Sequence, residues 1–501
     1  MDQEVGSSTL PPSIMFCGPP GIAMSDKAKK VPAKLLKGFR DYPPEDELTR
    51  QVLIDKTRSV FERYGYLPLQ TPALEFLTTL FGADYGKENK EQIFNFIGPD
   101  EVEMGLRFDL TAPLARFVAA NRELPTPFRR YQIAPVWRVD KPGPGRFREF
   151  LQFDIDIVGT SLVAADAEII AVMAETMSCL KIENFEVRYS NRKILNGLAQ
   201  FAGISPETAP DVFRVLDKLE KQGRDAVIME LGPGRTDKSG DVIPGLGFPD
   251  PQIALLEKFL DIAQAAGLSQ IDNAADLLGA SEMAADGFEE LREIGRYLDG
   301  MGADPAKARV DLTIVRGLGY YTGPVFETYL LDLPDYGSVF SGGRYDHLVS
   351  RFSGQPMPGT GSSIGVDRLL AALLKLEALE VRKSCAEVIV TTMDKGRMAD
   401  YFEMASQLRN EGFMVEVFLG NNRRIPKQLQ YADRLDIPVA VICGSDEFDK
   451  GQVTIKDLVA GRGLSKDVQD RAEWLKAEDV QVTIPRGDMI SHIRSLLNRN
   501  K

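Results

Sequence analysis

The stretch FRRYQIAPVWRVDKPGPGRFREFLQFDIDIVG, residues 128–159, decides how the chain folds. Two runs of extended character flank the turn KPGPG at residues 141–145. This arrangement predicts a β-hairpin with a long loop. Because side chains alternate between the two faces of a strand, Phe153, Ile155 and Ile157 share one apolar face. This face is suited to packing against a hydrophobic core.

The other face of the hairpin is polar, and its charges are ordered along the strand. The second run presents Arg146, Arg148, Gln152, Asp154 and Asp156, with Phe150 as the one apolar member. The facing positions of the first run are Gln132, Ala134, Val136 and Arg138. Small residues opposite polar ones leave room for a ligand that is anionic at one end and cationic at the other. Taken alone, the alternation fits an amphipathic hairpin with a solvated face equally well.

Length and charge narrow the class of protein. A chain of 501 residues suggests about three domains, and 44 % hydrophobic residues suit a globular protein. The net charge of -13 excludes a basic field over the whole surface, so any contact with nucleic acid must use local patches. No apolar run approaches the roughly 18 residues of a membrane span. We therefore expect no membrane association.

Cysteine and histidine are scarce and scattered. The four cysteines, Cys17, Cys179, Cys385 and Cys443, lie far apart without the spacing of metal ligands. Their placement favours a reduced cytoplasmic location over a disulfide framework or a zinc site. The chain contains only two histidines, His347 and His492, which argues against serine–histidine catalysis and against a histidine-ligated metal site. His347 adjoins a predicted turn and is most simply an incidental residue.

Composition and periodicity divide the chain into four parts. Residues 1–30 contain proline, glycine and serine without periodicity, which predicts a disordered tail. Residues 31–190 and 310–380 carry strands and helices of one domain. Residues 191–309 interrupt it with mostly helical patterns, which predicts a helical insertion. In residues 385–501 strands alternate with helices, which predicts a small α/β domain with at least partly parallel pairing.

Several elements of the first domain follow from local patterns. Residues 45–64 predict a helix, with Pro44 and three acids suited to its start. Prolines at both ends place the predicted strand 67–72 at an edge or interface. Further strands are predicted at residues 310–315, 323–331 and 338–340. A turn is predicted at residues 342–346, and the glycine-rich stretch 359–365 leads into a predicted helix at 366–374.

Three stretches resemble the motifs of class II aminoacyl-tRNA synthetases: residues 67–72, VWRVD at 136–140 with its loop and return strand, and GVDRLL at 365–370. Two more, RGLGYYTGPVFE at 316–327 and GGRYD at 342–346, resemble the signature of the histidyl-tRNA synthetase family. The resemblance runs from about residue 34 to the end. It implies an α+β catalytic domain with an antiparallel sheet of the class II synthetase type, a helical insertion and a C-terminal α/β anticodon-binding domain.

The activity implied by this resemblance is that of a histidine–tRNA ligase. Such an enzyme activates L-histidine with ATP to histidyl-adenylate and pyrophosphate, then transfers histidine to the 3′ end of tRNA(His). The substrate carboxylate is already ionised, so activation needs no general base. It needs stabilisation of negative charge at phosphorus, which arginines and Mg²⁺ supply. The resemblance also implies a cytoplasmic homodimer.

Roles for individual residues also come from the resemblance, which leaves the metal ligands unassigned. Catalysis falls to Arg316 and Arg138. ATP binding falls to Arg138, Asp140, Arg146 and Arg368. Histidine binding falls to Asp109, Thr111, Gln152, Asp156, Arg316, Tyr320, Tyr321 and Tyr345. The chain departs from the usual family pattern at Asp109, Asp140 and Asp156, where many relatives have glutamate, and at Gly319, where the usual residue is aspartate.

Two other functions remain open at this point. The first is a non-catalytic, histidine-binding regulatory subunit of ATP phosphoribosyltransferase. Such paralogues usually lack the anticodon-binding domain and the catalytic arginines, and this chain has both. The second is another class II synthetase, which would lack the signature at residues 316–327.

In the C-terminal unit, Arg423, Arg424 and Lys427 are mixed with acidic residues, so their pattern alone fits a solvated helix face.

Overall fold

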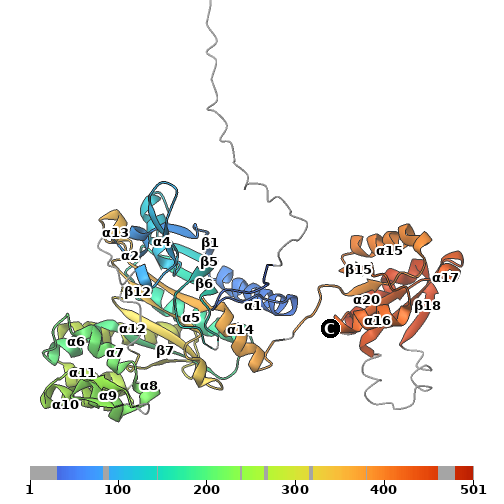
Figure 1. The fold of residues 1–501 in the computed structure, drawn as a ribbon. Helices are drawn as coiled ribbons and strands as arrows, with labels where there is room; N and C mark the ends of the chain where they lie inside the picture. The colour runs from blue at the N-terminus through green and yellow to red at the C-terminus, as the bar shows by residue number, and fades with distance from the viewer. Residues whose placement is uncertain are drawn as a thin grey trace, which may run out of the picture.

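A computed structural model describes residues 31–82, 90–143, 145–236, 240–264, 269–314, 320–379, 381–460 and 480–499. The predicted tail at residues 1–30 and the predicted catalytic residue Arg316 lie outside the described residues. The first domain is built on an eight-stranded sheet with the order β1-β5-β6-β13-β12-β11-β7-β10 (Figure 1). In that order the strands span Leu67–Pro68, Phe128–Trp137, Glu149–Val158, Gly359–Gly365, Phe340–Tyr345, Pro324–Leu330, Phe185–Asn191 and Ala308–Val310.

The centre of this sheet is antiparallel, as the fold class predicted. Every neighbouring pair from β5 to β7 is antiparallel, and only the edge strands β1 and β10 pair in parallel in the described sheet. The predicted hairpin is β5 and β6, which pair over ten positions from Phe128 with Val158 to Trp137 with Glu149. An antiparallel pair can be joined by a hairpin loop, and residues 138–148 connect β5 to β6, in agreement with the predicted long loop.

Helices cover the apolar face of the hairpin. Phe153, Ile155 and Ile157 are fully buried in the main core, as the alternation predicted. The ring of Phe61, on α1 (Pro44–Arg63), meets the ring of Phe153 edge-on at 4.7 Å. α1 packs beside α5 (Ala164–Cys179) and α14 (Val366–Lys375). The polar face of the hairpin is thereby directed away from the main core.

A smaller sheet and short helices lie next to the hairpin. The sheet has the order β2-β4-β3, with strands Leu74–Phe76, Glu103–Leu106 and Asn95–Ile97. The associated helices are α2 (Leu77–Phe81), α4 (Thr111–Ala120) and α13 (Ser350–Ser353), whereas the 3-10 turn η1 (Pro334–Tyr336) packs against β11. β4 leads directly towards α4, so the intervening residues 107–110 are carried to the polar face of the hairpin.

The chain between β7 and β10 is mainly helical. Its helices are α6 (Arg192–Phe201), α7 (Ala209–Leu216), α8 (Leu219–Gln222), α9 (Arg224–Leu231), α10 (Asp250–Ala263), α11 (Ser269–Leu278) and α12 (Glu282–Gly300), with a small hairpin of β8 (Gly234–Thr236) and β9 (Val242–Pro244). In Figure 1 they gather next to β7. Parallel pairing of β7 with β10 requires a crossover of this kind.

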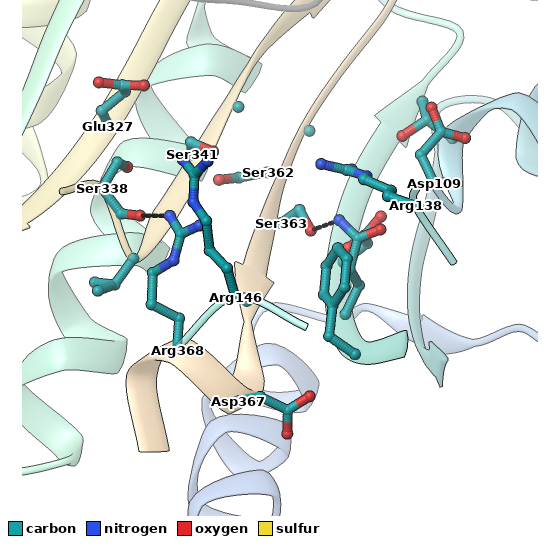
Figure 2. Close-up of a pocket in the computed structure, with 18 of the residues that line it drawn as sticks. Asp109, Arg138, Arg146, Glu327, Ser338, Ser341, Ser362, Ser363, Asp367 and Arg368 are labelled. Carbon is teal, nitrogen blue, oxygen red and sulfur yellow. Dashed lines mark hydrogen bonds between the residues drawn. The ribbon is translucent and has the colours of Figure 1, made fainter. Parts of the chain in front are cut away.

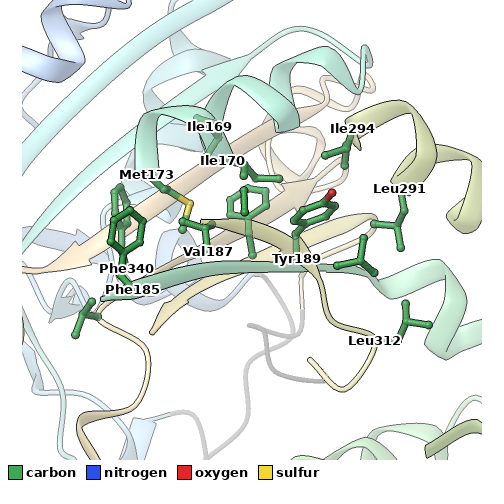
Figure 3. Packing of buried hydrophobic residues seen from close by; sticks show 14 of the residues in the cluster. Ile169, Ile170, Met173, Phe185, Val187, Tyr189, Leu291, Ile294, Leu312 and Phe340 are labelled. Atoms are coloured by element: carbon green, nitrogen blue, oxygen red, sulfur yellow. The ribbon is translucent and has the colours of Figure 1, made fainter. Parts of the chain in front are cut away.

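This helical segment shares a core with the sheet. Leu291 and Ile294 of α12 are buried near Tyr189 of β7 (Figure 3). Ile169 and Ile170 belong to α5, which packs beside α12, and they are buried in the same core. The last helix of the segment is therefore anchored to the sheet by ordinary apolar packing. The position of α12 is coupled to that of β7, which pairs with β11.

Four local predictions were wrong in extent or type. Only residues 308–310 form β10, because Asp311 accepts hydrogen bonds from Thr313 and starts a turn; Val315 lies outside the described residues. The predicted strand 67–72 is two residues long, consistent with its prolines. The predicted turn 342–346 lies largely within β12, and the predicted strand 338–340 overlaps β12 only at Phe340. The glycine-rich stretch 359–365 is β13. A Cβ added at Gly342 would lie 2.0 Å from the Gly361 carbonyl oxygen, so these glycines permit close strand pairing rather than turns.

The C-terminal unit has a five-stranded sheet with the order β15-β14-β16-β17-β18. β14 pairs in parallel with β15 and β16, and the other two pairs are antiparallel, so the partly parallel prediction is confirmed. β14 to β18 span Val388–Val390, Val415–Val417, Val439–Ile442, Gln452–Asp457 and Gln481–Pro485. The helices are η2 (Lys395–Arg397), α15 (Met398–Asn410), α16 (Ile425–Arg434), α17 (Ser445–Asp449), η3 (Arg486–Asp488) and α20 (Met489–Arg499). None of the helices described in either unit has the length and apolar character to cross a bilayer.

Candidate functional site

The polar face of the hairpin forms the floor of a cavity of about 390 Å³. Its walls come from the segment before α4, the loop after β5, the strands β12 and β13, and the start of α14. Every predicted site residue that the structure describes lines this cavity: Asp109, Thr111, Arg138, Asp140, Arg146, Gln152, Asp156, Tyr320, Tyr321, Tyr345 and Arg368. The structure places these residues together, and the roles predicted for them are taken up under the proposed function.

One end of the cavity is basic. Arg138 is held by a hydrogen bond from its Nε to the Phe108 carbonyl oxygen at 2.9 Å, and its guanidinium lies 5.2 Å from the centre of the Phe150 ring. Arg368 donates to the Ser338 carbonyl oxygen at 2.8 Å, and Figure 2 shows Arg146 reaching into the same region. Asp140 lies on the exposed rim. Three guanidinium groups around one cavity suit a ligand with several anionic oxygens.

The other end is acidic and buried. Asp109, Asp154 and Asp156 are each about 2 % exposed. Arg130, which is fully buried, forms an ion pair with Asp156 at 2.7 Å. The Tyr345 hydroxyl donates to the Asp156 Oδ1 atom at 2.5 Å. This end therefore suits a ligand group that is cationic and donates hydrogen bonds.

Burial shifts the protonation of these acids. Burial raises the pKa of Asp154 to about 7, an effect that the nearby Arg130 opposes and the Asp156 charge reinforces. Burial also raises the pKa of Asp156 to about 6, although Arg130 and the Tyr345 hydrogen bond act against it. The pKa of Asp109 is raised by the same desolvation. The acidic end therefore changes its charge in the neutral pH range when no ligand is bound.

Aromatic rings form a wall at the acidic end. The rings of Tyr320 and Tyr321 meet edge-on with centres 5.0 Å apart, and the ring of Tyr345 lies 6.2 Å from that of Tyr320. The glycines of β13 make room for this arrangement. A Cβ at Gly361 would lie 2.1 Å from Asp156 Oδ1, and one at Gly359 would lie 2.5 Å from the Tyr345 ring.

Sequence reasoning left out several residues that line or support the cavity. Arg130 and Asp154 both lie on the polar face of the hairpin. The alternation placed Asp154 there without giving it a role, and extending it from Gln132 to Arg130 would have found the other. The other omitted lining residues include Glu327, Ser338, Ser341, Ser362, Ser363 and Asp367. Ser362 and Ser363 lie in the glycine-rich stretch 359–365, which was not predicted to be a strand. Asp367 supports the site by accepting from the Leu151 backbone N–H at 2.7 Å and from Arg50 at 3.3 Å.

Arg148 lies on the polar face of the hairpin but does not join the cavity. Arg148 lies between the Asp140 and Lys37 carbonyl oxygens, at 3.4 and 3.5 Å, and is not a lining residue. No cluster of three or more histidine, cysteine, aspartate or glutamate side chains arranged for a metal ion occurs in the described part of the chain. Near the basic end the cavity contains a carboxylate, that of Glu327 (Figure 2).

The chain matches two protein-family models. The model of histidyl-tRNA synthetase matches residues 38–369, and the model of an anticodon-binding domain matches residues 387–478. The first match includes the whole cavity, and the second covers most of the C-terminal sheet.

Full-length relatives agree with these matches. Histidine–tRNA ligases from Cereibacter sphaeroides and Paracoccus denitrificans are 42 % and 43 % identical, over 94 % and 95 % of this chain and 99 % and 100 % of their own lengths. The crystal structure of histidyl-tRNA synthetase from Nostoc sp. PCC 7120 superposes with a TM-score of 0.76 at 32 % identity, covering 93 % of this chain and all of that one. Together, the cavity, the two family models and these relatives show that the chain belongs to the histidyl-tRNA synthetase family.

Proposed function

We propose that this chain is a histidine–tRNA ligase that forms histidyl-adenylate from L-histidine and ATP and then charges tRNA(His). The observation that carries the proposal is a single cavity with three arginines at one end and three buried carboxylates at the other. A reaction between a polyphosphate and an amino acid needs both ends within one enclosed space. Membership of the family supplies the identity of the amino acid.

At the basic end, the three arginines stabilise the charge that develops at phosphorus. The histidine carboxylate attacks the α-phosphate of ATP, and pyrophosphate leaves. Arg138 is held in place by the Phe108 carbonyl oxygen, so it can meet the α-phosphate without rearrangement. Arg146 and Arg368 bind the outer phosphates, and Asp140 contacts the adenine from the rim. Arg316, outside the described residues, bridges the histidine carboxylate and the α-phosphate.

At the acidic end, the pocket recognises the histidine side chain and its ammonium group. Asp109, Thr111 and Gln152 contact the ammonium group, and Asp156 and Tyr321 each contact one ring nitrogen. Tyr320 and Tyr345 complete the aromatic wall. A buried site with hydrogen-bonding partners for both ring nitrogens leaves those partners unpaired when another amino acid binds. Such a site rejects competitors by several orders of magnitude.

Mg²⁺ enters with ATP in this proposal. Mg²⁺ is commonly bound through one or two carboxylates together with substrate phosphates and water. The Glu327 carboxylate lines the cavity near Ser338 and Ser341, at the basic end, and so fits this requirement (Figure 2). When bound there, Mg²⁺ neutralises charge on the phosphates.

Two further partners are proposed on different grounds. The C-terminal unit binds tRNA(His), as its match to an anticodon-binding domain suggests. A homodimer is supported by apolar side chains on β1, β2 and β3 that are 44–70 % exposed in a single chain: Leu67, Leu74, Phe76, Phe96 and Ile97. Sedimentation of the full chain tests the dimer, and a monomer at micromolar concentration would contradict it. The location proposed for the enzyme is the cytoplasm.

The regulatory-subunit alternative is less well supported. A structure from Bacillus halodurans, described as an ATP phosphoribosyltransferase regulatory subunit/histidyl-tRNA synthetase, is 25 % identical and covers 80 % of this chain with a TM-score of 0.66. This chain also matches the anticodon-binding model, and it retains Arg138, Arg146 and Arg368 in the cavity. A purely regulatory protein has no use for these features.

Amino-acid-dependent ATP–pyrophosphate exchange tests the proposal directly. We expect exchange with L-histidine alone among the standard amino acids, followed by charging of tRNA(His) when tRNA is added. Absence of exchange with every amino acid would refute the activation step. Exchange with a different amino acid would refute the assignment of the pocket, and exchange without charging would refute the transfer step.

A further inference from the structure

The floor of the cavity is a regular array of three rows across three strands. The first row contains Ala134, Gln152 and Gly365, from β5, β6 and β13. The second row contains Gln132, Asp154 and Ser363. The third row contains Arg130, Asp156 and Gly361. Asp154 therefore lies in the central row of the floor.

The spacing of these rows raises a question about substrate size. Residues two apart on a strand are separated by about 6.6–6.8 Å, so Gln152 and Asp156 lie about 13–14 Å apart along an ideal strand. One histidine molecule does not comfortably span that distance. A histidine whose ring contacts Asp156 carries its ammonium group closer to the central row than to Gln152. Asp154 lies at that intermediate position.

The environment of Asp154 also indicates an interaction still to be made. Its side chain is 2 % exposed and lines the cavity, and in the described part of the chain its Oδ1 atom has no hydrogen-bond partner. The Oε1 atoms of Gln132 and Gln152, which flank it, also lack partners among the described residues. Buried acceptors without donors are costly. A ligand with several N–H donors would satisfy them.

Charge at the acidic end points to the same kind of ligand. Three carboxylates, those of Asp109, Asp154 and Asp156, surround one fully buried guanidinium, that of Arg130. When all three acids are ionised, this end of the cavity carries excess negative charge. A cationic donor removes both the charge excess and the unmet acceptors. The α-ammonium group of an amino acid carries one positive charge and three donors.

We propose that Asp154 is a further specificity-determining residue, whose carboxylate accepts a hydrogen bond from the α-ammonium group of histidine beside Asp109. This inference rests on the proposed function, because it takes histidine as the ligand. This inference replaces the ammonium contact assigned above to Gln152, whose Nε2 instead donates to the Ser363 hydroxyl at 2.6 Å. In this proposal the first row orients Ser363 of the second row, the second row binds the ammonium group and the third row binds the ring.

Asp154 must lose a proton to act in this way. Burial raises its pKa to about 7; the Arg130 charge and a hydrogen bond with Ser363 oppose this rise, and the charges of Asp156 and Asp109 reinforce it. The other ionisable groups that interact with it are Arg107, across the sheet, and Tyr321, in the cavity wall. An ammonium group within about 4–6 Å lowers the pKa of a carboxyl by one to three units. Histidine binding below pH 7 therefore releases the Asp154 proton.

Asp154→Asn, paired with two ligands, tests the contact. L-Histidine has the ammonium group, and 3-(imidazol-4-yl)propionate has the same ring and carboxylate without it. We expect the variant to bind L-histidine about ten- to a hundredfold more weakly, the range for a hydrogen bond to a charged group. It should bind the deaminated analogue as the parent protein does. Equal weakening for both ligands, or no weakening for either, would overturn the proposal.

Proton release provides a second readout, which a merely structural role would not change. Calorimetry of L-histidine binding at pH 6.5, in two buffers of different ionisation enthalpy, counts the protons released. Titration of the histidine ring itself contributes equally in both proteins, so the difference reports Asp154. We expect the parent protein to release roughly half a proton more than Asp154→Asn. Equal release would overturn the proposal.

Glu149→Gln is the matched control. It neutralises an exposed acid on the same strand, which accepts a hydrogen bond from Trp137 and does not line the cavity. Its affinity for both ligands should equal that of the parent protein. The Michaelis constant for ATP should be unchanged in Asp154→Asn, which shows that the cavity has kept its shape. Failure of the parent protein to support histidine-dependent exchange would refute the proposed function, whereas a normal parent with an unaffected variant would refute only the role of Asp154.

Discussion

Tyr345→Phe removes one hydroxyl group from the acidic end of the cavity. That hydroxyl donates to Asp156 Oδ1 at 2.5 Å, and the Tyr345 side chain is 2 % exposed. The ring remains, so the packing against Tyr320 is preserved. The hydrogen bond holds down the pKa of Asp156, which burial has already raised to about 6. Its loss raises that pKa further.

The size of the shift follows from the bond. A hydrogen bond to a charged group contributes about 1.5–3 kcal/mol, and one pKa unit corresponds to 1.36 kcal/mol. The protonated acid also interacts with a phenol, so the differential effect is about one unit and the pKa of Asp156 becomes about 7. The ionised fraction then falls from about one half to about one tenth at pH 6, and from about nine tenths to about one half at pH 7.

The assay is kcat/KM for histidine in ATP–pyrophosphate exchange between pH 6 and pH 9. If ionised Asp156 binds the imidazole ring, the ratio of parent to variant should be about five at pH 6, about two at pH 7 and close to one above pH 8.5. The Michaelis constant for ATP should not change. Tyr297→Phe is the control and should behave as the parent. It removes a hydroxyl bonded to Glu293 on the solvent-exposed face of α12. A ratio independent of pH would refute the reasoning.

The same shift predicts a change in stability with pH. In the folded protein Asp156 has a pKa above its unfolded value, so the folded state binds the proton more tightly. Its contribution to the free energy of unfolding is therefore fully present only below its unfolded pKa of about 3.9, and it is lost as the pH rises through about 6. In Tyr345→Phe the loss continues to about pH 7. The difference in free energy of unfolding between the parent and the variant, measured by denaturant unfolding, should be about 1.4 kcal/mol larger above pH 8 than at pH 4.

Three further predictions concern other parts of the site. Arg368→Ala should raise the Michaelis constant for ATP about tenfold or more and leave histidine affinity unchanged, because a charge-assisted contact to phosphate is lost; an effect on histidine instead would reassign the residue. Arg316→Ala should lower the exchange rate by about two to three orders of magnitude while calorimetry still detects histidine binding, as expected for a transition-state donor; unchanged exchange would remove it from the mechanism. Arg344→Met leaves buried Asp166 without its partner and should lower the free energy of unfolding by about 3–5 kcal/mol at pH 7.5. Because the pKa of Asp166 is already raised to about 6 by burial, the deficit should shrink at pH 5, where the acid is protonated; a deficit independent of pH would contradict this account.

Strand alternation carried much of the prediction of the site. It separated Phe153, Ile155 and Ile157 from Gln152, Asp154 and Asp156, and the cavity floor has this division. It was less informative for β12 and β13, where the glycines of residues 342–346 were interpreted as a turn and residues 359–365 were not predicted to be a strand. A glycine in a strand that lies against a bulky neighbour has the same local pattern as a glycine in a turn. Only the position of the neighbouring strand distinguishes the two.

The amino-acid sequence by itself determined the hairpin, the order of charges along it, the family resemblance and the division into a catalytic part and an α/β C-terminal unit. These depend on local periodicity and on motifs that occupy neighbouring positions in the chain. The tertiary structure decided which distant residues share the cavity. Asp109, Asp154, Tyr345 and Arg368 are far apart in sequence and meet only because β6, β13 and β12 pair side by side. It also decided their protonation, because desolvation depends on how completely a side chain is covered. The raised pKa of Asp154 is therefore a property of the folded sheet and of no segment within it.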